Sequence, residues 1–232
     1  MTSLITKNIK KFRRDLKLGK VLVGGWMQAS NSNLAEVMSD SNYNWIALDM
    51  EHGSFSIGDL PDLFRSIEVN NKLPLVRLPN KNLEICNQVL DAGCAGLIIP
   101  NIKNEIELKT LIRSCYLPPH GSRGVGYSRA NLYGKEFKKF NKQNNKPIII
   151  AMIENINSVK RLEKILSVQG LDAILIGPYD LSASMGITGK FNNLKFKSTI
   201  NIIKKLSKKF KIPCGIHAIE PNFKVIKNYV KA

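Results

Sequence analysis

The segment WIALDMEHGSFS, residues 45–56, changes abruptly from apolar to ionisable residues. Its apolar run fits a buried strand and ends in Asp49, Glu51 and His52. A second apolar run, LPLVRL, carries Arg77 close to its end. Unpaired charge beside a core is costly, so charged side chains at these places need either partners or a function.

Two carboxylates occupy similar places further along the chain. Glu154 follows IIIAMI, and Asp180 lies in IGPYDLS behind Gly177 and Pro178. A lone arginine at a strand end is usually an ion-pair partner, and an aspartate before a helix is usually an N-cap. His52, Arg77 and the two carboxylates together form a set of reactive groups. The two carboxylates suit a hard divalent cation such as Mg²⁺ or Mn²⁺, with room for an oxygen-rich substrate. The three histidines are dispersed, which argues against a zinc site.

The segments that position these residues alternate between strand-like and helix-like patterns. We expect strands at residues 21–27, 45–50, 73–78, 96–102, 147–154, 172–178 and 214–220, and helices near 33–41, 57–70, 82–92, 104–116, 157–168, 192–210 and 221–231. Near-continuous apolar strands separated by helices indicate a parallel sheet. Seven such units predict a single domain over residues 1–232, a TIM-type (β/α) barrel, with an open doubly wound sheet as the alternative. In a barrel the carboxyl ends of the strands share one rim, so the charged side chains would meet there.

The connection at residues 117–146 has few periodic apolar positions, and we expect a long functional loop. Its GVG is too short to cradle a phosphate, and neither a Walker motif nor G-x-G-x-x-G occurs in the chain. A nucleotide-dependent mechanism is therefore not expected.

Charge and composition argue against several other classes of protein. The net charge is +17, but many lysines form helix-surface pairs, without the patterns of nucleic-acid-binding motifs. No apolar run is long enough to span a membrane, and the basic N-terminus is typical of an amphipathic helix, not of a signal peptide. The four scattered cysteines favour free thiols in the cytoplasm. We expect neither nucleic acid nor membrane as a partner.

The motifs DMEHGSFS, LVRLP, GSRGVGYSRA, MIEN and IGPYDLSASMG occur in the order and spacing of the HpcH/HpaI aldolase family, which the chain resembles from about Gly19 onward. This resemblance implies a barrel of the phosphoenolpyruvate/pyruvate-binding kind. It implies a divalent-metal-dependent class II aldolase that reversibly cleaves a 4-hydroxy-2-oxo acid into pyruvate and an aldehyde. It also implies a homo-oligomer, either a trimer or a hexamer.

By the same resemblance, Glu154 and Asp180 would hold Mg²⁺, Mn²⁺ or Co²⁺, which would chelate the carboxylate and keto oxygens of pyruvate. Arg77 would hydrogen-bond the keto oxygen and stabilise the enolate. His52 would take the proton of the 4-hydroxyl group, directly or through water. The other positions of these motifs that would contact the substrate are Met152, Gly177, Pro178 and Tyr179.

Two acids are candidates for orienting His52. Asp49 lies three residues upstream, and Asp91 in VLDAG matches the family position credited with raising the basicity of the histidine. The order of the elements places Asp91 at the far end of a helix, so its role rests on the resemblance alone. Glu51 is expected to stabilise the loop.

The sequence departs from the family pattern in two places. Met152 stands where the family commonly has a glutamine that contacts the substrate, and a thioether donates no hydrogen bond, so the polar contacts of the substrate must differ. The family closes its barrel with one more strand after the segment that ends at Ala232, so we expect a chain that is either truncated relative to the family or an open barrel with an unpaired sheet edge. Phe223, Ile226 and Val230 form an apolar stripe in the last predicted helix, and we expect it to need a subunit partner.

Three alternatives stay open. A citrate-lyase-like CoA-ester lyase would share the barrel and the metal carboxylates, but the chain lacks a CoA-handling extension. A Schiff-base aldolase would need a lysine at a strand end, where Lys103 is the candidate. A non-catalytic, lysine-rich binding protein would not need the complete set of strand-end residues. The aldehyde also stays open among succinic semialdehyde, lactaldehyde, glyceraldehyde-type sugars and tartronate semialdehyde, with Arg123 and Arg129 as candidate contacts.

Overall fold

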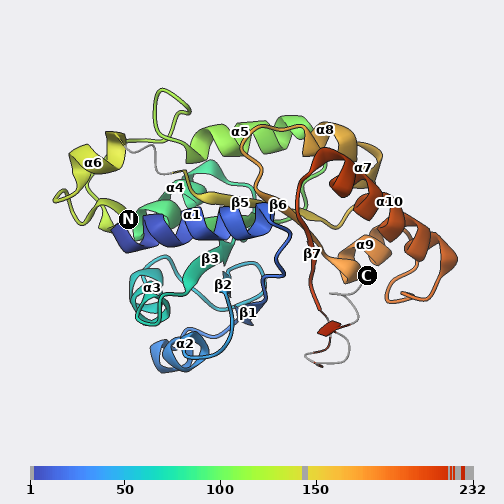
Figure 1. Cartoon of the computed structure of the whole chain (residues 1–232), viewed down its shortest axis with the longest axis horizontal. Helices are drawn as coiled ribbons and strands as arrows, with labels where there is room; N and C mark the ends of the chain where they lie inside the picture. The colour runs from blue at the N-terminus through green and yellow to red at the C-terminus, as the bar shows by residue number, and fades with distance from the viewer. Residues whose placement is uncertain (1–2, 143–145, 219, 221, 223–225, 228–232) are drawn as a thin grey trace. The chain divides into compact units, whose positions relative to one another are not determined.

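The chain is an α/β protein whose strands run parallel (Figure 1). The computed structural model describes residues 3–142, 146–218, 220, 222, 226 and 227. Its contacts divide the chain into two compact units, residues 1–99 with 110–149 and residues 100–109 with 150–232. Within each unit the strands pair in the order of the sequence. The predicted fold class, parallel strands alternating with helices, is confirmed at this level.

The first unit holds four complete strands. Its elements are α1 (Ser3–Lys17), β1 (Gly24–Met27), α2 (Ser32–Ser39), β2 (Trp45–Asp49), α3 (Leu60–Glu68), β3 (Leu73–Arg77), α4 (Leu83–Ala92), β4 (Gly96–Ile99), the end of α5 (Glu105–Cys115), η1 (Arg129–Asn131), α6 (Phe137–Lys142) and the start of β5 (Ile148–Ile153). Every residue of β2, β3 and β4 is buried. Such uniform burial is expected of parallel strands that are covered on both faces.

The N-terminal helix α1 is an integral part of the first unit. Its residues Ile5, Ile9 and Phe12 recur at helical spacing and are all buried. The guanidinium of Arg13 donates a hydrogen bond of 3.0 Å to the carbonyl oxygen of Lys146, just before β5. The prediction of an amphipathic first helix is therefore confirmed.

The second unit contains the rest of β5 with two further strands. Its elements are α7 (Ile156–Lys160), α8 (Leu162–Leu166), β6 (Ala173–Ile176), α9 (Pro178–Ser184), α10 (Leu194–Phe210) and β7 (Cys214–Ile216). β5 and β6 are buried throughout. In their register Met152 lies opposite Leu175, and Ile153 opposite Ile176. The residues that follow these two strands, Glu154 and Gly177, therefore begin their loops side by side.

Asparagine N-caps begin four of the helices and end the extended segments before them. The side-chain oxygens of Asn31, Asn82, Asn155 and Asn193 accept hydrogen bonds from backbone N–H groups in the first turns of α2, α4, α7 and α10. Such a side chain satisfies an N–H group that has no partner within the helix. These caps fix where the loops after the strands end.

The structure differs from the sequence predictions in several elements. The connection at 117–146 is not entirely a loop, because it contains η1 and α6. The helix expected at 157–168 is divided at Arg161 into α7 and α8, and the short helix α9 was not foreseen because IGP was assigned to a strand end. The helix predicted at 221–231, with its apolar stripe, lies largely outside the described residues. Within the described part, no helix is long and apolar enough to cross a membrane.

Gly96 tests how closely the strands of the first unit pack. A Cβ atom at this position would lie 2.5 Å from both the Cβ and the carbonyl oxygen of Ile148. We expect Gly96→Ala to lower the free energy of unfolding by about 1–3 kcal/mol, because the backbone would have to move. Urea titration would measure the loss.

Gly124→Ala is the matched control, because a Cβ atom there meets nothing within 4 Å. That variant should unfold at the same urea concentration as the wild type, or at a slightly higher one. Equal midpoints for the two variants would contradict this account of the packing.

Candidate active site

The site in the first unit is built on a buried ion pair between Asp49 and Arg77. Asp49 is the last residue of β2, Arg77 is the last of β3, and the parallel register places them opposite each other. Arg77 Nε donates to Asp49 Oδ1 at 2.7 Å, and Nη2 donates to Oδ2 at 2.6 Å. The two side chains are only 5% and 1% exposed. This two-pronged geometry compensates for the hydration that both charges lose.

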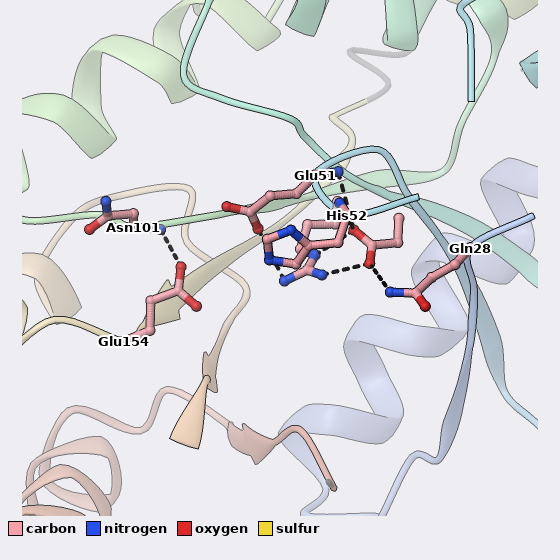
Figure 2. A network of polar contacts seen from close by, with 7 residues as sticks. Gln28, Glu51, His52, Asn101 and Glu154 are labelled. Carbon is pink, nitrogen blue, oxygen red and sulfur yellow. Dashed lines mark hydrogen bonds and ion pairs between the residues drawn. The ribbon is translucent and has the colours of Figure 1, made fainter. Parts of the chain in front are cut away.

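Asp49 also organises the loop that follows its own strand. Its Oδ1 atom accepts hydrogen bonds of 3.2 Å from the backbone N–H groups of Glu51 and His52. Its Oδ2 atom accepts one of 3.0 Å from the side-chain amide of Gln28, which follows β1 (Figure 2). One carboxylate thus holds both the guanidinium and the turn that carries His52.

Arg77 is constrained on further sides. Its Nη1 atom forms an ion pair of 3.0 Å with Glu51 Oε2, and its guanidinium carbon lies 5.0 Å from the centroid of the Trp26 ring. A guanidinium on an aromatic face gains an additional electrostatic attraction. Glu51 stabilises the loop, as predicted, through the arginine itself.

The Asp49 carboxyl is ionised to a lower pH than usual. Burial alone would raise its pKa, but hydrogen bonds from Arg77 and Gln28, the charge of Arg77 and the backbone N–H of His52 outweigh burial and lower it. The ion pair therefore persists across the neutral and mildly acidic range.

His52 occupies an exposed position in the turn after β2. The turn needs glycine at position 53, because a Cβ atom there would lie 2.3 Å from the carbonyl oxygen of Asp49. Asp49 contacts the backbone of His52, and in the described residues neither it nor Asp91 hydrogen-bonds the imidazole. Asp49 thus positions the histidine through the main chain.

Asp91 lies at the carboxyl end of α4, as the order of elements predicted. Its Oδ1 atom is 2.5 Å from Nη2 of Arg123, which is itself buried. The second loop arginine, Arg129, forms hydrogen bonds with both carboxylate oxygens of Glu68. The two arginines that were candidates for substrate contacts therefore brace the long connection against α3 and α4.

The second unit holds the predicted metal carboxylate Glu154, which is 5% exposed. Its Oε1 atom accepts a hydrogen bond of 2.6 Å from the backbone N–H of Asn101 (Figure 2). A Cβ atom at position 177 would lie 2.5 Å from Oε2 and 3.3 Å from the methyl carbon of Met152. Glycine at 177 therefore lets this buried carboxylate pack directly against the backbone.

The other predicted residues of this unit surround the start of α9. Gly177 is its N-cap, Pro178 its first residue, and Asp180 its third residue, exposed in the first turn. Asp180 is thus not the N-cap of α9. A capping role was the alternative to a role as metal ligand. Tyr179 is half exposed, with its ring edge-on to Phe191 at 5.1 Å between centroids.

The donor set fits a divalent metal of the hard kind. Glu154 offers a buried carboxylate whose Oε2 atom lies against Gly177, and Asp180 offers an exposed carboxylate. Carboxylate oxygens with open positions beside them are typical of Mg²⁺ and Mn²⁺ sites. The described residues contain no group of three or more histidine, cysteine, aspartate or glutamate side chains placed to hold a metal, so most ligands would have to be water or substrate.

Sequence reasoning missed Gln28 and Asn101. Gln28 directly follows β1, and Asn101 comes two residues after the end of β4. Both therefore obey the strand-end rule that identified the charged residues, but their neutral side chains gave no charge signal. All four cysteines are free, as predicted.

Parallel strands with ionisable groups at or shortly after their carboxyl ends place this chain in the α/β class, and the comparisons with known proteins show its family. The family model described as HpcH/HpaI aldolase/citrate lyase matches residues 22–219. The chain is 30% identical over 202 residues to a hydroxypyruvate/pyruvate aldolase of Roseobacter denitrificans, covering 86% of this chain and 79% of the relative. It is 31% identical over 209 residues to a 5-keto-4-deoxy-D-glucarate aldolase of Citrobacter koseri, covering 90% and 81%.

A solved structure has the same fold. The crystal structure of an HpcH/HpaI aldolase/citrate lyase family protein from Burkholderia cenocepacia matches with a TM-score of 0.90 at 25% identity, covering 95% of this chain and 88% of that one. The chain belongs to the HpcH/HpaI aldolase/citrate lyase family. The predicted enzyme class, a carbon–carbon lyase of the aldolase type, is confirmed, and the relatives do not support the CoA-ester lyase or the non-catalytic alternative.

The Asp49–Arg77 pair yields a stability prediction. Asp49→Asn removes the charge but keeps the shape, and it leaves the buried guanidinium poorly compensated. We expect a loss of about 3–5 kcal/mol in the free energy of unfolding at pH 7, measured by urea titration. Glu51→Gln, at a position whose side chain is 23% exposed, should cost about 1 kcal/mol or less.

The difference in the free energy of unfolding between wild type and Asp49→Asn should depend on pH. Because the pKa of Asp49 is lowered on folding, its contribution is complete above its unfolded pKa of about 3.9 and is lost as the pH falls through the lower folded value. The difference between wild type and Asp49→Asn should therefore shrink below about pH 4. A difference in the free energy of unfolding that stays constant from neutral to strongly acidic pH would contradict this role of the Asp49 charge.

Proposed function

We propose that this aldolase requires a divalent metal, Mg²⁺, Mn²⁺ or Co²⁺, and reversibly cleaves a 4-hydroxy-2-oxo acid to pyruvate and an aldehyde. The observation that carries the proposal is the placement of its four reactive groups after strand ends. Arg77 ends β3, His52 lies in the turn after β2, and Glu154 and Asp180 follow β5 and β6. Family membership and the aldolase names of the relatives support it. We also propose that the strands belong to a TIM-type barrel.

In this proposal Glu154 and Asp180 hold the metal. When bound, such a metal acts as a Lewis acid on the keto oxygen of the substrate. The oxygen Oε1 of Glu154 is already engaged by a backbone N–H, which fixes the side chain before any ligand arrives. Gly177 and Pro178 begin α9 so that Asp180 falls in its first turn.

Arg77 supplies a fixed positive charge. Held by Asp49 and Glu51, its guanidinium is oriented before the substrate binds. We propose that it donates to the keto oxygen and stabilises the enolate that forms when the C3–C4 bond breaks. A preoriented donor costs no reorganisation during the reaction, and this makes it effective.

His52 acts as the general base. We propose that its imidazole, directly or through water, takes the proton from the 4-hydroxyl group while the C3–C4 bond breaks. The aldehyde carbonyl forms at C4, and the bonding electron pair passes to the enolate of pyruvate. One proton leaves the 4-hydroxyl group, and one proton is added to C3 of the enolate to give pyruvate. The reaction therefore neither consumes nor releases a net proton.

The choice of aldehyde rests on other groups. Met152 is buried beside Glu154 and donates no hydrogen bond, whereas Tyr179 is half exposed in the first turn of α9. Arg123 and Arg129 are engaged by Asp91 and Glu68, so we assign the polar substrate contacts to the start of α9. Two relatives are named as a hydroxypyruvate/pyruvate aldolase and a 5-keto-4-deoxy-D-glucarate aldolase, which supports an oxygen-rich substrate. The cytoplasmic location and the trimeric or hexameric assembly stay predictions.

The metal requirement gives the first functional test. EDTA should abolish the release of pyruvate from 4-hydroxy-2-oxo acids, and Mg²⁺, Mn²⁺ or Co²⁺ should restore it, because two carboxylates are the proposed protein ligands. Lactate dehydrogenase coupling would measure the pyruvate, with Ca²⁺ addition as a comparison. Full turnover in metal-free enzyme, together with borohydride trapping of pyruvate on a lysine, would refute the proposal.

The role of His52 is tested separately. His52→Ala should keep metal and pyruvate binding, measured by calorimetry, but lose about 10²–10⁴-fold in kcat for cleavage, since a general base contributes that much. Because the side chain is exposed, its removal should leave the melting temperature nearly unchanged. His120→Ala, at another exposed histidine, is the matched control and should retain wild-type kcat. Loss of metal binding in His52→Ala would instead make this residue a ligand.

A further inference from the structure

Asn101 adopts a backbone conformation that side chains rarely accept. Its φ angle is +47°, in the left-handed region, although it is not a glycine. Asparagine tolerates this region better than most residues, whereas a β-branched side chain there is a genuine outlier. A positive φ angle at a residue other than glycine, two residues after a strand end, suggests that the conformation itself is needed.

The N–H group of Asn101 donates to the carboxylate of Glu154. The distance from the backbone nitrogen to Oε1 is 2.6 Å, which is short for an N–H donor and typical of a hydrogen bond to a charged acceptor. Glu154 is 5% exposed, so little water competes for this oxygen. In Figure 2 the dashed line between the two residues shows this contact.

The two oxygens of the Glu154 carboxylate have different surroundings. The N–H group of Asn101 engages Oε1, while Oε2 faces the place where Gly177 has no side chain, 2.5 Å from a hypothetical Cβ atom. Rotation of the carboxylate would exchange these surroundings. The hydrogen bond to Oε1 therefore fixes the plane of the carboxylate and the direction in which its other oxygen points.

We propose that Asn101 is a positioning residue, whose left-handed backbone holds Glu154 in the orientation that binds the divalent metal. The inference rests on the proposed metal role of Glu154 and adds the residue that sets its geometry. The element to which we assign this role is the main-chain N–H group, at a residue type that tolerates the positive φ angle. Outer partners that orient a metal ligand typically contribute 10–100-fold in affinity.

Titration calorimetry with Mn²⁺, in the absence of substrate, tests this directly. Asn101→Val should weaken Mn²⁺ binding by about 10–100-fold, because a β-branched residue strains the left-handed backbone and the peptide unit that carries the N–H group must shift to relieve the strain. Asn101→Ala should weaken it less, and Asn101→Gly should bind within about threefold of wild type, since glycine adopts positive φ freely. Glu154→Gln gives the affinity that remains without the ligand charge.

Asn71→Val is the matched control. Asn71 also has a positive φ angle, +60°, in the turn before β3, and it belongs to the other unit. The same substitution there imposes the same backbone strain and should leave Mn²⁺ affinity unchanged. Circular dichroism and melting temperatures of all variants separate loss of folding from loss of affinity, and Asn101→Ala serves if Asn101→Val does not fold.

The outcomes separate the inference from the proposed function. Wild-type affinity in both Asn101→Val and Asn101→Ala would overturn the positioning role while leaving the metal role of Glu154 intact. Equal weakening in Asn101→Gly and Asn101→Val would also overturn it, because the side chain and not the backbone angle would then be responsible. Wild type and Glu154→Gln with the same Mn²⁺ affinity would refute the metal role itself, and the inference with it.

Discussion

A carboxylate and a guanidinium that are both buried lose most of their hydration, and only well-formed hydrogen bonds offset this loss. Asp49 and Arg77 meet that condition because the parallel register of β2 and β3 places their last residues opposite each other. The fork of the arginine then matches both carboxylate oxygens. The same carboxylate accepts two backbone N–H groups of the next turn, so the ion pair and the loop that carries His52 depend on one side chain.

In the second unit, a main-chain group orients the buried carboxylate. Glu154 also follows a buried strand, but the contact that orients it comes from the backbone N–H of Asn101, held at a left-handed angle. Gly177 contributes by lacking a side chain. In both units a carboxylate at a strand end is oriented by its neighbours before any ligand binds. Such preorganisation is what electrostatic catalysis requires, and it agrees with membership of an aldolase family.

The residues around these groups show which polar side chains brace the fold. Arg123 and Arg129, which stood out in the long connection, are paired with Asp91 and Glu68. The prediction that such a connection contacts the substrate followed from its length and polarity. The structure shows that length and polarity also arise when a connection contains short helices and is held by ion pairs. The charge of an arginine alone does not distinguish a substrate contact from a structural ion pair, because the guanidinium needs an anionic partner in both.

Much of this protein followed from its sequence. The apolar runs predicted the strands and their order, because parallel strands are buried along their whole length. The ionisable residues at or shortly after the ends of those runs pointed to Arg77, His52 and Glu154. Only the tertiary structure decided that Asp49 holds Arg77 and that Asn101 holds Glu154. These pairings depend on register and on one backbone angle, which join residues 28 and 53 positions apart in the sequence. Local periodicity carries no information about such distant contacts.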